Sequence, residues 1–243
     1  MPDYHPLLVE LYDTDNPDGP DHDFFRAVTN EAGAETVVDL GCGTGILTVT
    51  FCREDRKVIG IDPSPAMLGY ARRRPGAGQV AWILGDSSAI GDSAADVVVM
   101  SGNVAQHITG AAWRRALRDI HRGLRPGGVL AFERRNVLAR SWENWTKEKT
   151  LTTRDSIIGQ LMEWKEVSSM DGAGIVTLTC HNVLMDTGED IVETLSLSFL
   201  SQAQVVSDLD AAGFDVTGVW RNWTREPVEE KSPLMVFEAT RRH

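Results

Sequence analysis

The sequence predicts an α/β fold, in which a doubly wound sheet carries an additional antiparallel β segment. Three observations support this prediction. Short β-branched runs alternate with helical stretches from residue 36 to about residue 136, as in parallel strands joined by crossover helices. A glycine-rich turn, DLGCGTG, directly follows the first of these runs. Beyond residue 140 apolar and polar residues alternate, which is typical of antiparallel strands with one buried face.

The first half of the chain contains five segments that are expected to form buried strands. The run ADVVVMSG is apolar without alternation, so this strand should be covered on both faces. The five expected strands are residues 36–40, 58–62, 80–84, 96–101 and 129–133.

Capping residues mark the expected helices between these strands. Ser64 can cap a helix that has Pro65 at its first position and ends before Pro75 and Gly76. Thr109 is expected to cap a second helix, which RPGG ends. The apolar face of that helix consists of Trp113, Ala116, Leu117, Ile120 and Leu124.

The second half predicts three antiparallel strands joined by turns, over residues 161–170, 175–185 and 191–199. Ser201 and Gln204 form a capping box that opens a helix ending at Gly213. Two further strands are expected, at residues 214–220 and 234–239.

Composition narrows the classes of function. The 243 residues include 24 Lys and Arg against 35 Asp and Glu, so the formal charge is −11 and a nucleic-acid partner is disfavoured. The three cysteines contain no C-x-x-C pair, which indicates reduced thiols in the cytoplasm. No apolar stretch reaches eighteen residues and the N-terminus has no export pattern, so neither a membrane span nor secretion is expected.

The glycine-rich turn is expected to bring bare backbone to a ligand. A strand, a glycine-rich turn and a helix together aim free N–H groups at an anionic or polar group. The dinucleotide pattern G-x-G-x-x-G would need glycine at Ile46, and the triphosphate-binding pattern is absent. Taken alone, the turn could be purely structural.

Three acidic residues favour a ligand site over a structural turn. Asp39, Asp62 and Asp86 end three consecutive expected strands, at the edge where open α/β sheets bind ligands. Asp62 stands where a carboxylate can accept hydrogen bonds from the two hydroxyls of a ribose.

With these motifs the sequence resembles the class I S-adenosylmethionine-dependent methyltransferases over nearly its whole length. DLGCGTG is similar to the family's signature loop, which implies that Asp39, Gly41, Cys42, Gly43 and Gly45 line the methionine part of the cofactor. GIDPSPAML and GDSSA resemble the family's adenosine-binding segments. The resemblance implies that Asp62 holds the ribose, that Pro63 and Met67 lie near the adenine, and that Asp86, which Ser87 follows, meets the adenine amino group.

SGNVAQHI resembles the end of the family's fourth strand, which would place Asn103 to His107 along the cofactor and the substrate entrance. Tyr12, in an N-terminal lid, is expected to meet the cofactor carboxylate. No NPPY-type stretch follows strand four, which disfavours the branch that methylates nucleic acids and protein amides.

The resemblance implies a Rossmann-like doubly wound seven-stranded sheet with its last strand antiparallel, and a small antiparallel β insertion covering the active site. We expect a single methyltransferase domain over residues 1–243. Its parts are an N-terminal lid (1–35), a cofactor-binding core (36–140), a substrate-covering insertion (141–200), and a C-terminal helix and strand pair (201–243).

The residues that would act on the acceptor are less specific. His107 is the candidate general base, with a structural donor as the alternative, and a base is needed for a hydroxyl or an acidic carbon but not for an amine. Trp142 and Trp145 either line an apolar or aromatic substrate pocket or pack in the core. Glu133 either anchors substrate or forms a surface pair. The acidic segment 13–23 predicts a solvated hinge rather than a metal site.

The predicted function is methyl transfer from S-adenosylmethionine to nitrogen or oxygen of a small-molecule metabolite, with S-adenosylhomocysteine as product. One alternative is a protein that binds S-adenosylmethionine without transferring its methyl group. Another is a nicotinamide-dependent oxidoreductase, against which Ile46 argues. The sequence leaves open the acceptor and whether the chain forms a homodimer.

Overall fold

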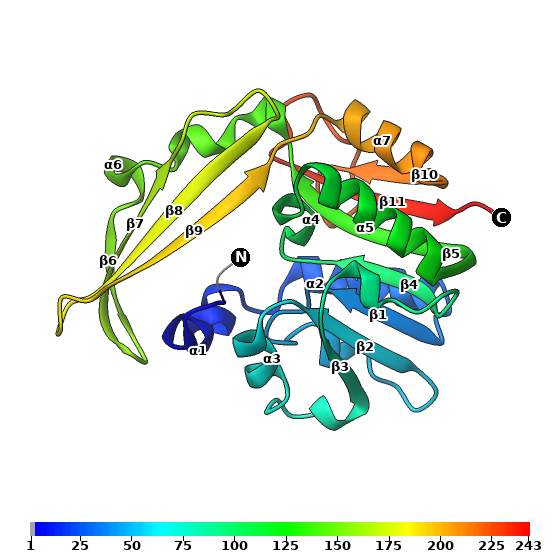
Figure 1. Ribbon diagram of the computed structural model, residues 1–243, viewed down its shortest axis with the longest axis horizontal. Coiled ribbons are helices and arrows are strands. Elements are labelled where there is room, and N and C mark those ends of the chain that lie inside the picture. The colour runs from blue at the N-terminus through cyan, green and yellow to red at the C-terminus, as the bar shows by residue number, and fades with distance from the viewer. Residues whose placement is uncertain (1–2) are drawn as a thin grey trace.

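The structure is a computed structural model that describes residues 3–243, and its centre is a seven-stranded mixed sheet (Figure 1). The strand order is β10-β11-β5-β4-β1-β2-β3. Only β11 runs antiparallel to its neighbours, between β5 and β10, so the expected seven-stranded sheet with an antiparallel last strand is confirmed. The strands are β1 (Thr36–Leu40), β2 (Lys57–Asp62), β3 (Val80–Leu84), β4 (Ala95–Met100), β5 (Leu124–Arg135), β10 (Phe214–Trp220) and β11 (Leu234–Arg241).

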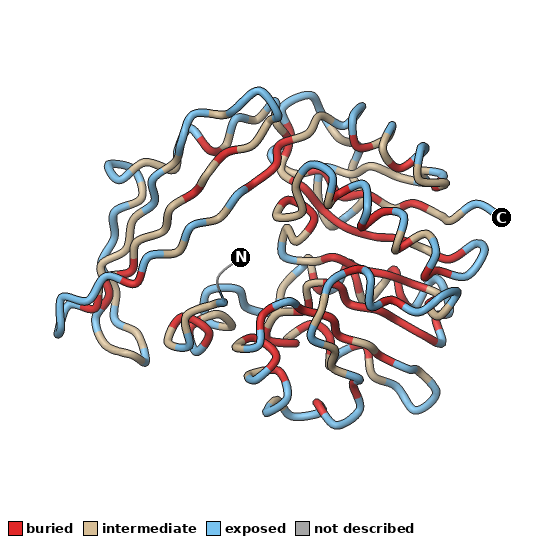
Figure 2. Tube along the Cα trace, viewed as in Figure 1, coloured by how far each residue is buried: buried red, intermediate tan, exposed pale blue. Residues whose placement is uncertain are grey.

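Both faces of this sheet are covered, so that β1 is buried along its whole length and β4 along nearly all of its length (Figure 2). On one face, α5 (Gly110–Gly123) and α7 (Gln202–Ala211) pack against side chains such as Val98 and Phe132. On the other face, α2 (Pro20–Glu31) packs Phe25 and Val28 against Val37 and Val99. This packing holds the carboxyl ends of the neighbouring strands β4, β1 and β2 side by side at one edge of the sheet.

The helix signals in the sequence are largely confirmed. The Ser64 side chain accepts from the backbone of Met67 at the start of α3 (Pro65–Ala71), and Ser201 and Gln204 form the capping box of α7. Thr109 occupies the N-cap position of α5, but its side chain makes no capping bond, so that detail was wrong. The other short helices are α4 (Val104–His107), α6 (Lys147–Thr150), η2 (Ala77–Gln79), η3 (Ser87–Ala89), η4 (Val137–Ala139) and η5 (Ser141–Asn144).

A second sheet of four antiparallel strands lies between β5 and α7 in the chain. It contains β6 (Thr152–Ser156), β7 (Gly159–Val167), β8 (Ile175–Leu184) and β9 (Asp190–Ser198), in that order. Three strands were expected; β6 was missed because its polar sequence, TTRDS, shows no apolar alternation. We call this element the outer sheet.

One face of the outer sheet packs against the N-terminal helix α1 (Pro6–Asp15), as Figure 1 shows. Leu8 and Leu11 of α1 contact Leu161, Leu184 and Ile191 of the sheet. We call this the inner face, because α1 separates it from the edge of the main sheet. Residues 1 and 2 of the expected lid lie outside the described residues. Within residues 3–243, no helix is both long and apolar enough to cross a membrane.

Candidate active site

The three glycines of the loop after β1 adopt left-handed backbone conformations for different reasons. A Cβ atom on Gly41 (φ 78°) would lie 2.5 Å from Val104, and one on Gly45 (φ 75°) would lie 2.5 Å from Trp82. On Gly43 (φ 52°), the nearest atom would be a ring carbon of Tyr12 at 3.9 Å. Gly41 and Gly45 therefore allow tight packing, whereas Gly43 faces open space.

That space is a cavity of about 270 Å³ between the glycine loop, the end of β4 and the two N-terminal helices. Four of the residues that the sequence assigned to the cofactor, Tyr12, Gly41, Cys42 and Gly43, line this cavity, and their contacts with a cofactor stay predictions. The cavity has no lysine or arginine in its lining. The lining residues are Tyr12, Asn16, Pro17, Asp21, His22, Gly41, Cys42, Gly43, Thr44, Ile46, Leu47, Ser101 and Gly102.

Asp62, at the end of β2, fastens the glycine loop to the neighbouring strand. Its carboxylate accepts from the backbone N–H of Gly43 and of Ser64, each at 2.8 Å. The residue is 7% exposed, and burial raises the pKa of its carboxyl against these two bonds. Each carboxylate oxygen keeps lone-pair capacity for a further donor.

Asp39, at the end of β1, is almost fully buried beneath the loop. Its Oδ2 accepts from the Thr48 hydroxyl at 2.6 Å, and its Oδ1 has no partner within residues 3–243. Burial, together with the nearby charge of Asp62, raises the pKa of Asp39 to about 7. Burial and these acidic neighbours also raise the pKa of Tyr12 to about 12, so its phenol is neutral at physiological pH.

Four of the loop N–H groups that the sequence predicted to be free for a ligand are already bonded within the chain. The N–H groups of Gly41 and Cys42 donate to Ile61, that of Gly45 donates to Cys42, and that of Gly43 donates to Asp62. The following residues form a single 3₁₀ turn, η1 (Thr48–Phe51), rather than an α-helix. The loop therefore offers a ligand close approach and carboxylates, not a helix N-terminus.

Glu133 and Asn103 meet beside the cavity. The N–H of Asn103, in a left-handed conformation after β4, donates to Glu133 Oε1. Glu133 is 2% exposed, and its Oε2 has no partner in the described chain. Burial raises the pKa of Glu133 to about 8, and Asp21 of the cavity adds to the rise. This buried position excludes the expected alternative of a surface ion pair.

The residues expected near the adenine form a separate group along β2 and β3. Met67 and Ser87 are buried, and the Ser87 hydroxyl donates to Asp119 at 2.8 Å. Pro63 and Asp86 are exposed; hydrogen bonds from Ser88 lower the pKa of Asp86, which also pairs with Arg115 at 3.0 Å. None of these four lines the 270 Å³ cavity, so their adenine contacts stay predictions.

The residues expected at the acceptor divide between two environments. His107 ends α4, where burial and the charge of Arg135 lower its pKa to about 4, so the imidazole is neutral at physiological pH. Trp142 packs on Phe199 with ring centroids 4.4 Å apart, and Trp145 lies 6.2 Å from the same ring. These contacts favour core packing for both tryptophans.

The sequence did not identify two residues of the N-terminal segment that reach the site. Asn16 and Asp21 line the cavity, yet no periodic pattern connects them to the glycine loop. The acidic segment is exposed and non-helical between α1 and α2, over residues 16–18, but its two ends are helical and Asp13 is docked. Asp13 accepts from the Thr44 hydroxyl at 2.5 Å and pairs with Arg74, which fixes α1 against the loop.

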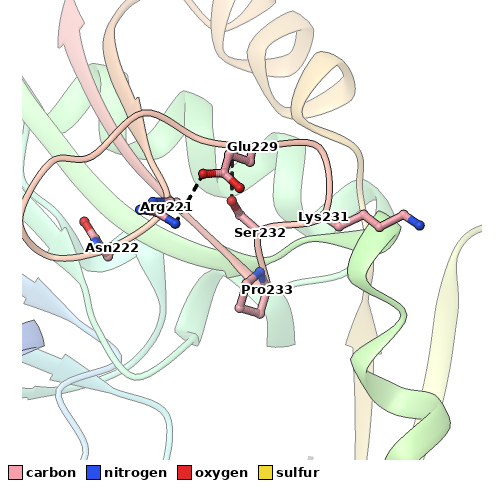
Figure 3. Close-up of a pocket in the computed structure, with 6 residues that line it drawn as sticks. All are labelled: Arg221, Asn222, Glu229, Lys231, Ser232 and Pro233. Atoms are coloured by element: carbon pink, nitrogen blue, oxygen red, sulfur yellow. Dashed lines mark hydrogen bonds and ion pairs between the residues drawn. The ribbon is translucent and has the colours of Figure 1, made fainter.

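A second cavity, of about 310 Å³, lies in the loop between β10 and β11 (Figure 3). Arg221, Lys231 and Glu229 line it, and Arg221 pairs with Glu229 at 3.3 Å. None of the predicted site residues belongs to this cavity.

Comparison with known proteins relates this chain to methyltransferases. Residues 37–128 match the family model described as a methyltransferase domain. Glycine N-methyltransferase of Mus musculus is 29% identical over 130 residues, which cover 46% of this chain and 44% of that protein. The chain spans less than half the length of the curated relatives it matches.

Solved structures resemble the chain over almost its whole length. The CcbJ methyltransferase from Streptomyces caelestis has a TM-score of 0.79 at 18% identity and covers 97% of this chain and 96% of its own. The sugar N-methyltransferase KedS8 from a Streptoalloteichus species has a TM-score of 0.71 at 19% identity, covering 96% and 92%. The match to a methyltransferase domain is thus confined to residues 37–128, and the chain as a whole has the fold of these solved methyltransferases.

Proposed function

We propose that this protein transfers a methyl group from S-adenosylmethionine to nitrogen or oxygen of a small molecule. The observation that supports this most directly is the cavity at Gly43, which is bordered by carboxylates and has no lysine or arginine in its lining. The family match over residues 37–128 agrees with this assignment.

The charge of the cavity suits a sulfonium cofactor. Asp21 lines it, and Asp39, Asp62 and Glu133 are close enough to raise the pKa of the lining residue Tyr12. A cation is attracted to such a set, and the attraction is strong in partly buried surroundings. The pyrophosphate of a nicotinamide dinucleotide would meet carboxylates without a compensating cation, which disfavours the oxidoreductase alternative.

The residues present fit the parts of the cofactor. The open side of Gly43, with Gly41, Cys42 and Tyr12, would hold the methionine part, and Asp62 retains acceptor capacity for the ribose. Gly45 and Asp39 support the loop from below. When bound, the sulfonium supplies an activated methyl group, whose bond electrons return to sulfur as the acceptor's lone pair forms the new bond.

The outer sheet and α1 would cover the acceptor and exclude water from it. KedS8, a sugar N-methyltransferase, resembles the chain over nearly its full length, which agrees with a small acceptor. A neutral His107 is able to accept a proton from a hydroxyl acceptor, because burial and Arg135 keep it uncharged. We place the protein in the cytoplasm as a single domain and leave homodimer formation to direct measurement.

Thermal unfolding with added ligands tests this proposal. S-adenosylhomocysteine at about 100 times its dissociation constant should add about 2.7 kcal/mol to the native state, and NADH should add nothing. Stabilisation by NADH alone would contradict the proposal. Incubation with S-adenosylmethionine and candidate acceptors, followed by mass spectrometry, distinguishes a methyltransferase from a protein that only binds the cofactor.

A further inference from the structure

The inner face of the outer sheet carries a polar row between two apolar clusters. At one end, Leu161, Leu184 and Ile191 pack on α1; at the other, Leu178 and Leu197 pack with Trp142. Because side chains alternate along a strand, Glu193 lies between Ile191 and Leu195 on this face. Cys180 of β8 is its cross-strand neighbour.

Glu193 has no cationic hydrogen-bond partner, whereas Glu163, the other carboxylate on the inner face, has one. Glu163 binds Arg154 through two bonds, at 2.6 and 3.1 Å. Glu193 makes no hydrogen bond or ion pair within residues 3–243, and burial raises the pKa of its carboxyl. A half-buried carboxylate without a protein partner is available to a cationic group of a ligand, and its partial burial strengthens that attraction.

Two tyrosines connect Glu193 to the cofactor cavity. The rings of Tyr4 and Tyr12 lie edge to face with centroids 6.1 Å apart. Tyr12 lines the cavity, whereas burial of the phenol, together with Tyr12, Glu193 and Asp62, raises the pKa of Tyr4. Since Glu193 shares the face on which Ile191 packs against α1, it lies on the side of the outer sheet that carries the helix of Tyr12.

A second unpartnered carboxylate oxygen belongs to the main sheet. Glu133 Oε2 is fully buried and has no partner in the described chain; Glu133 raises the pKa of Tyr12, and Asp21 raises the pKa of Glu133. The nearby Arg135 is turned toward Trp145, with its guanidinium 5.2 Å from the ring centroid. The region between the sheets thus has a carboxylate from each sheet near the two tyrosines and an apolar cluster at each end of the inner face. Its inner face also carries one lysine, Lys165 of β7, which lies across Cys180 from Glu193.

We propose that this region binds the methyl acceptor as a small amine on an apolar or aromatic frame. Glu193 recognises its ammonium group and takes one proton from it, which frees the nitrogen lone pair that forms the new bond to the methyl group. The proposal rests on the proposed function and names its substrate class. Carboxylate and aromatic groups are the partners that an ammonium ion prefers. The flanking apolar clusters provide contacts for the rest of the molecule.

Isothermal titration of the protein–S-adenosylhomocysteine complex tests this assignment. The probes are benzylamine, benzyl alcohol and benzoate, which share a ring and differ in charge. The wild-type complex should bind benzylamine best. Glu193→Gln should weaken benzylamine about tenfold, as expected for a lost bond to a charged group, and should leave benzyl alcohol unchanged.

Two further variants separate recognition from structural damage. Glu166→Gln is the matched control, because Glu166 lies on the opposite face of the same sheet, where it accepts from Trp164. This variant should bind all three probes like the wild type. Glu193→Lys should reverse the preference from benzylamine to benzoate, a change that misfolding cannot produce.

Unchanged benzylamine binding in Glu193→Gln, or a wild-type complex that binds benzylamine no better than benzyl alcohol, would overturn the assignment. S-adenosylhomocysteine affinity is measured first for each variant and should stay within about twofold of wild type, since Glu193 is outside the cofactor cavity. Failure of the wild-type protein to bind S-adenosylhomocysteine would instead contradict the proposed function.

Discussion

Replacing Asp62 separates its two roles, as a fastener of the glycine loop and as a cofactor ligand. Asp62→Ala removes the acceptor of two backbone N–H bonds, from Gly43 and Ser64, each 2.8 Å long. A buried donor left without a partner costs about 1–3 kcal/mol. The two together predict a loss of about 2–6 kcal/mol in the free energy of unfolding.

The isosteric change Asp62→Asn should cost about half as much. Its amide oxygen can keep one of the two bonds, while its NH₂ group faces the other donor. Loss of the charge also removes the cost of burying it, which is visible in the raised pKa of Asp62. Both variants should weaken S-adenosylhomocysteine, because the ribose loses its charged acceptor.

Urea denaturation and calorimetric titration measure the two effects. At roughly 3 kcal/mol per molar urea, the midpoint of Asp62→Ala should fall by roughly 1–2 M. Asp92→Ala is the control: that carboxylate is 75% exposed and pairs with Arg122, so the loss should be about 0–1 kcal/mol. An unchanged midpoint would refute the loop-fastening role, and reduced stability with unchanged cofactor affinity would refute the cofactor role.

Four further predictions follow from the site and its surroundings. Gly43→Val should abolish S-adenosylhomocysteine binding in titration calorimetry, because the valine side chain enters the cavity. Gly45→Ala should mainly lower the melting temperature, because the added methyl group crowds Trp82. Binding of S-adenosylhomocysteine by Gly43→Val would refute the role of the cavity. Glu133→Gln should flatten the dependence of unfolding free energy on pH. Folding raises the pKa of Glu133 from 4.5 to about 8. The favourable contribution of Glu133 to the free energy of unfolding is therefore complete below pH 4.5 and is lost as the pH rises to 8, by up to about 5 kcal/mol. Equal slopes of unfolding free energy against pH in wild type and Glu133→Gln would argue against this. S-adenosylmethionine should release more protons than S-adenosylhomocysteine on binding near pH 7, because the sulfonium lowers the raised pKa of Asp39, and calorimetry in buffers of different ionisation enthalpy measures the difference. Trp142→Ala should cost about 3–5 kcal/mol in urea denaturation through its lost contact with Phe199, and a neutral effect would favour the substrate-pocket interpretation instead.

The sequence predicted the strands of the main sheet well because burial on both faces demands uninterrupted apolar runs. Residues 36–40 and 80–84 were predicted with the bounds that the structure has. The polar strand β6 carries no such signal: it is held by pairing with β7 and by the bonds of Arg154 to Glu163 and Asp15. Such long-range pairing leaves no local pattern.

The site was predictable where one motif contains it and not where distant segments meet. The glycine loop and Asp62 are read from short stretches of chain. In contrast, Asp21 reaches the cavity because α1 and α2 dock against the loop, partly through the bond of Asp13 to Thr44. The hydrogen bonds that occupy the loop N–H groups also arise from pairing of β1 with β2, which the loop sequence does not reveal.

The hydrogen-bond partner of the Glu133 carboxylate also could not be predicted from neighbouring residues in the sequence. Its sequence neighbours, Arg134 and Arg135, suggest an ion pair, but alternation along β5 directs Arg134 to the opposite face, where its guanidinium lies 4.7 Å from the centre of the Trp113 ring. Glu133 is left with the Asn103 N–H as its partner in the described chain.

A crystal structure of the protein with S-adenosylhomocysteine tests the central claim most directly. The account predicts the amino-acid part of the ligand beside Gly43 and Tyr12, with the ribose hydroxyls on Asp62. An adenosyl group bound elsewhere, with the space at Gly43 filled only by solvent, would contradict it.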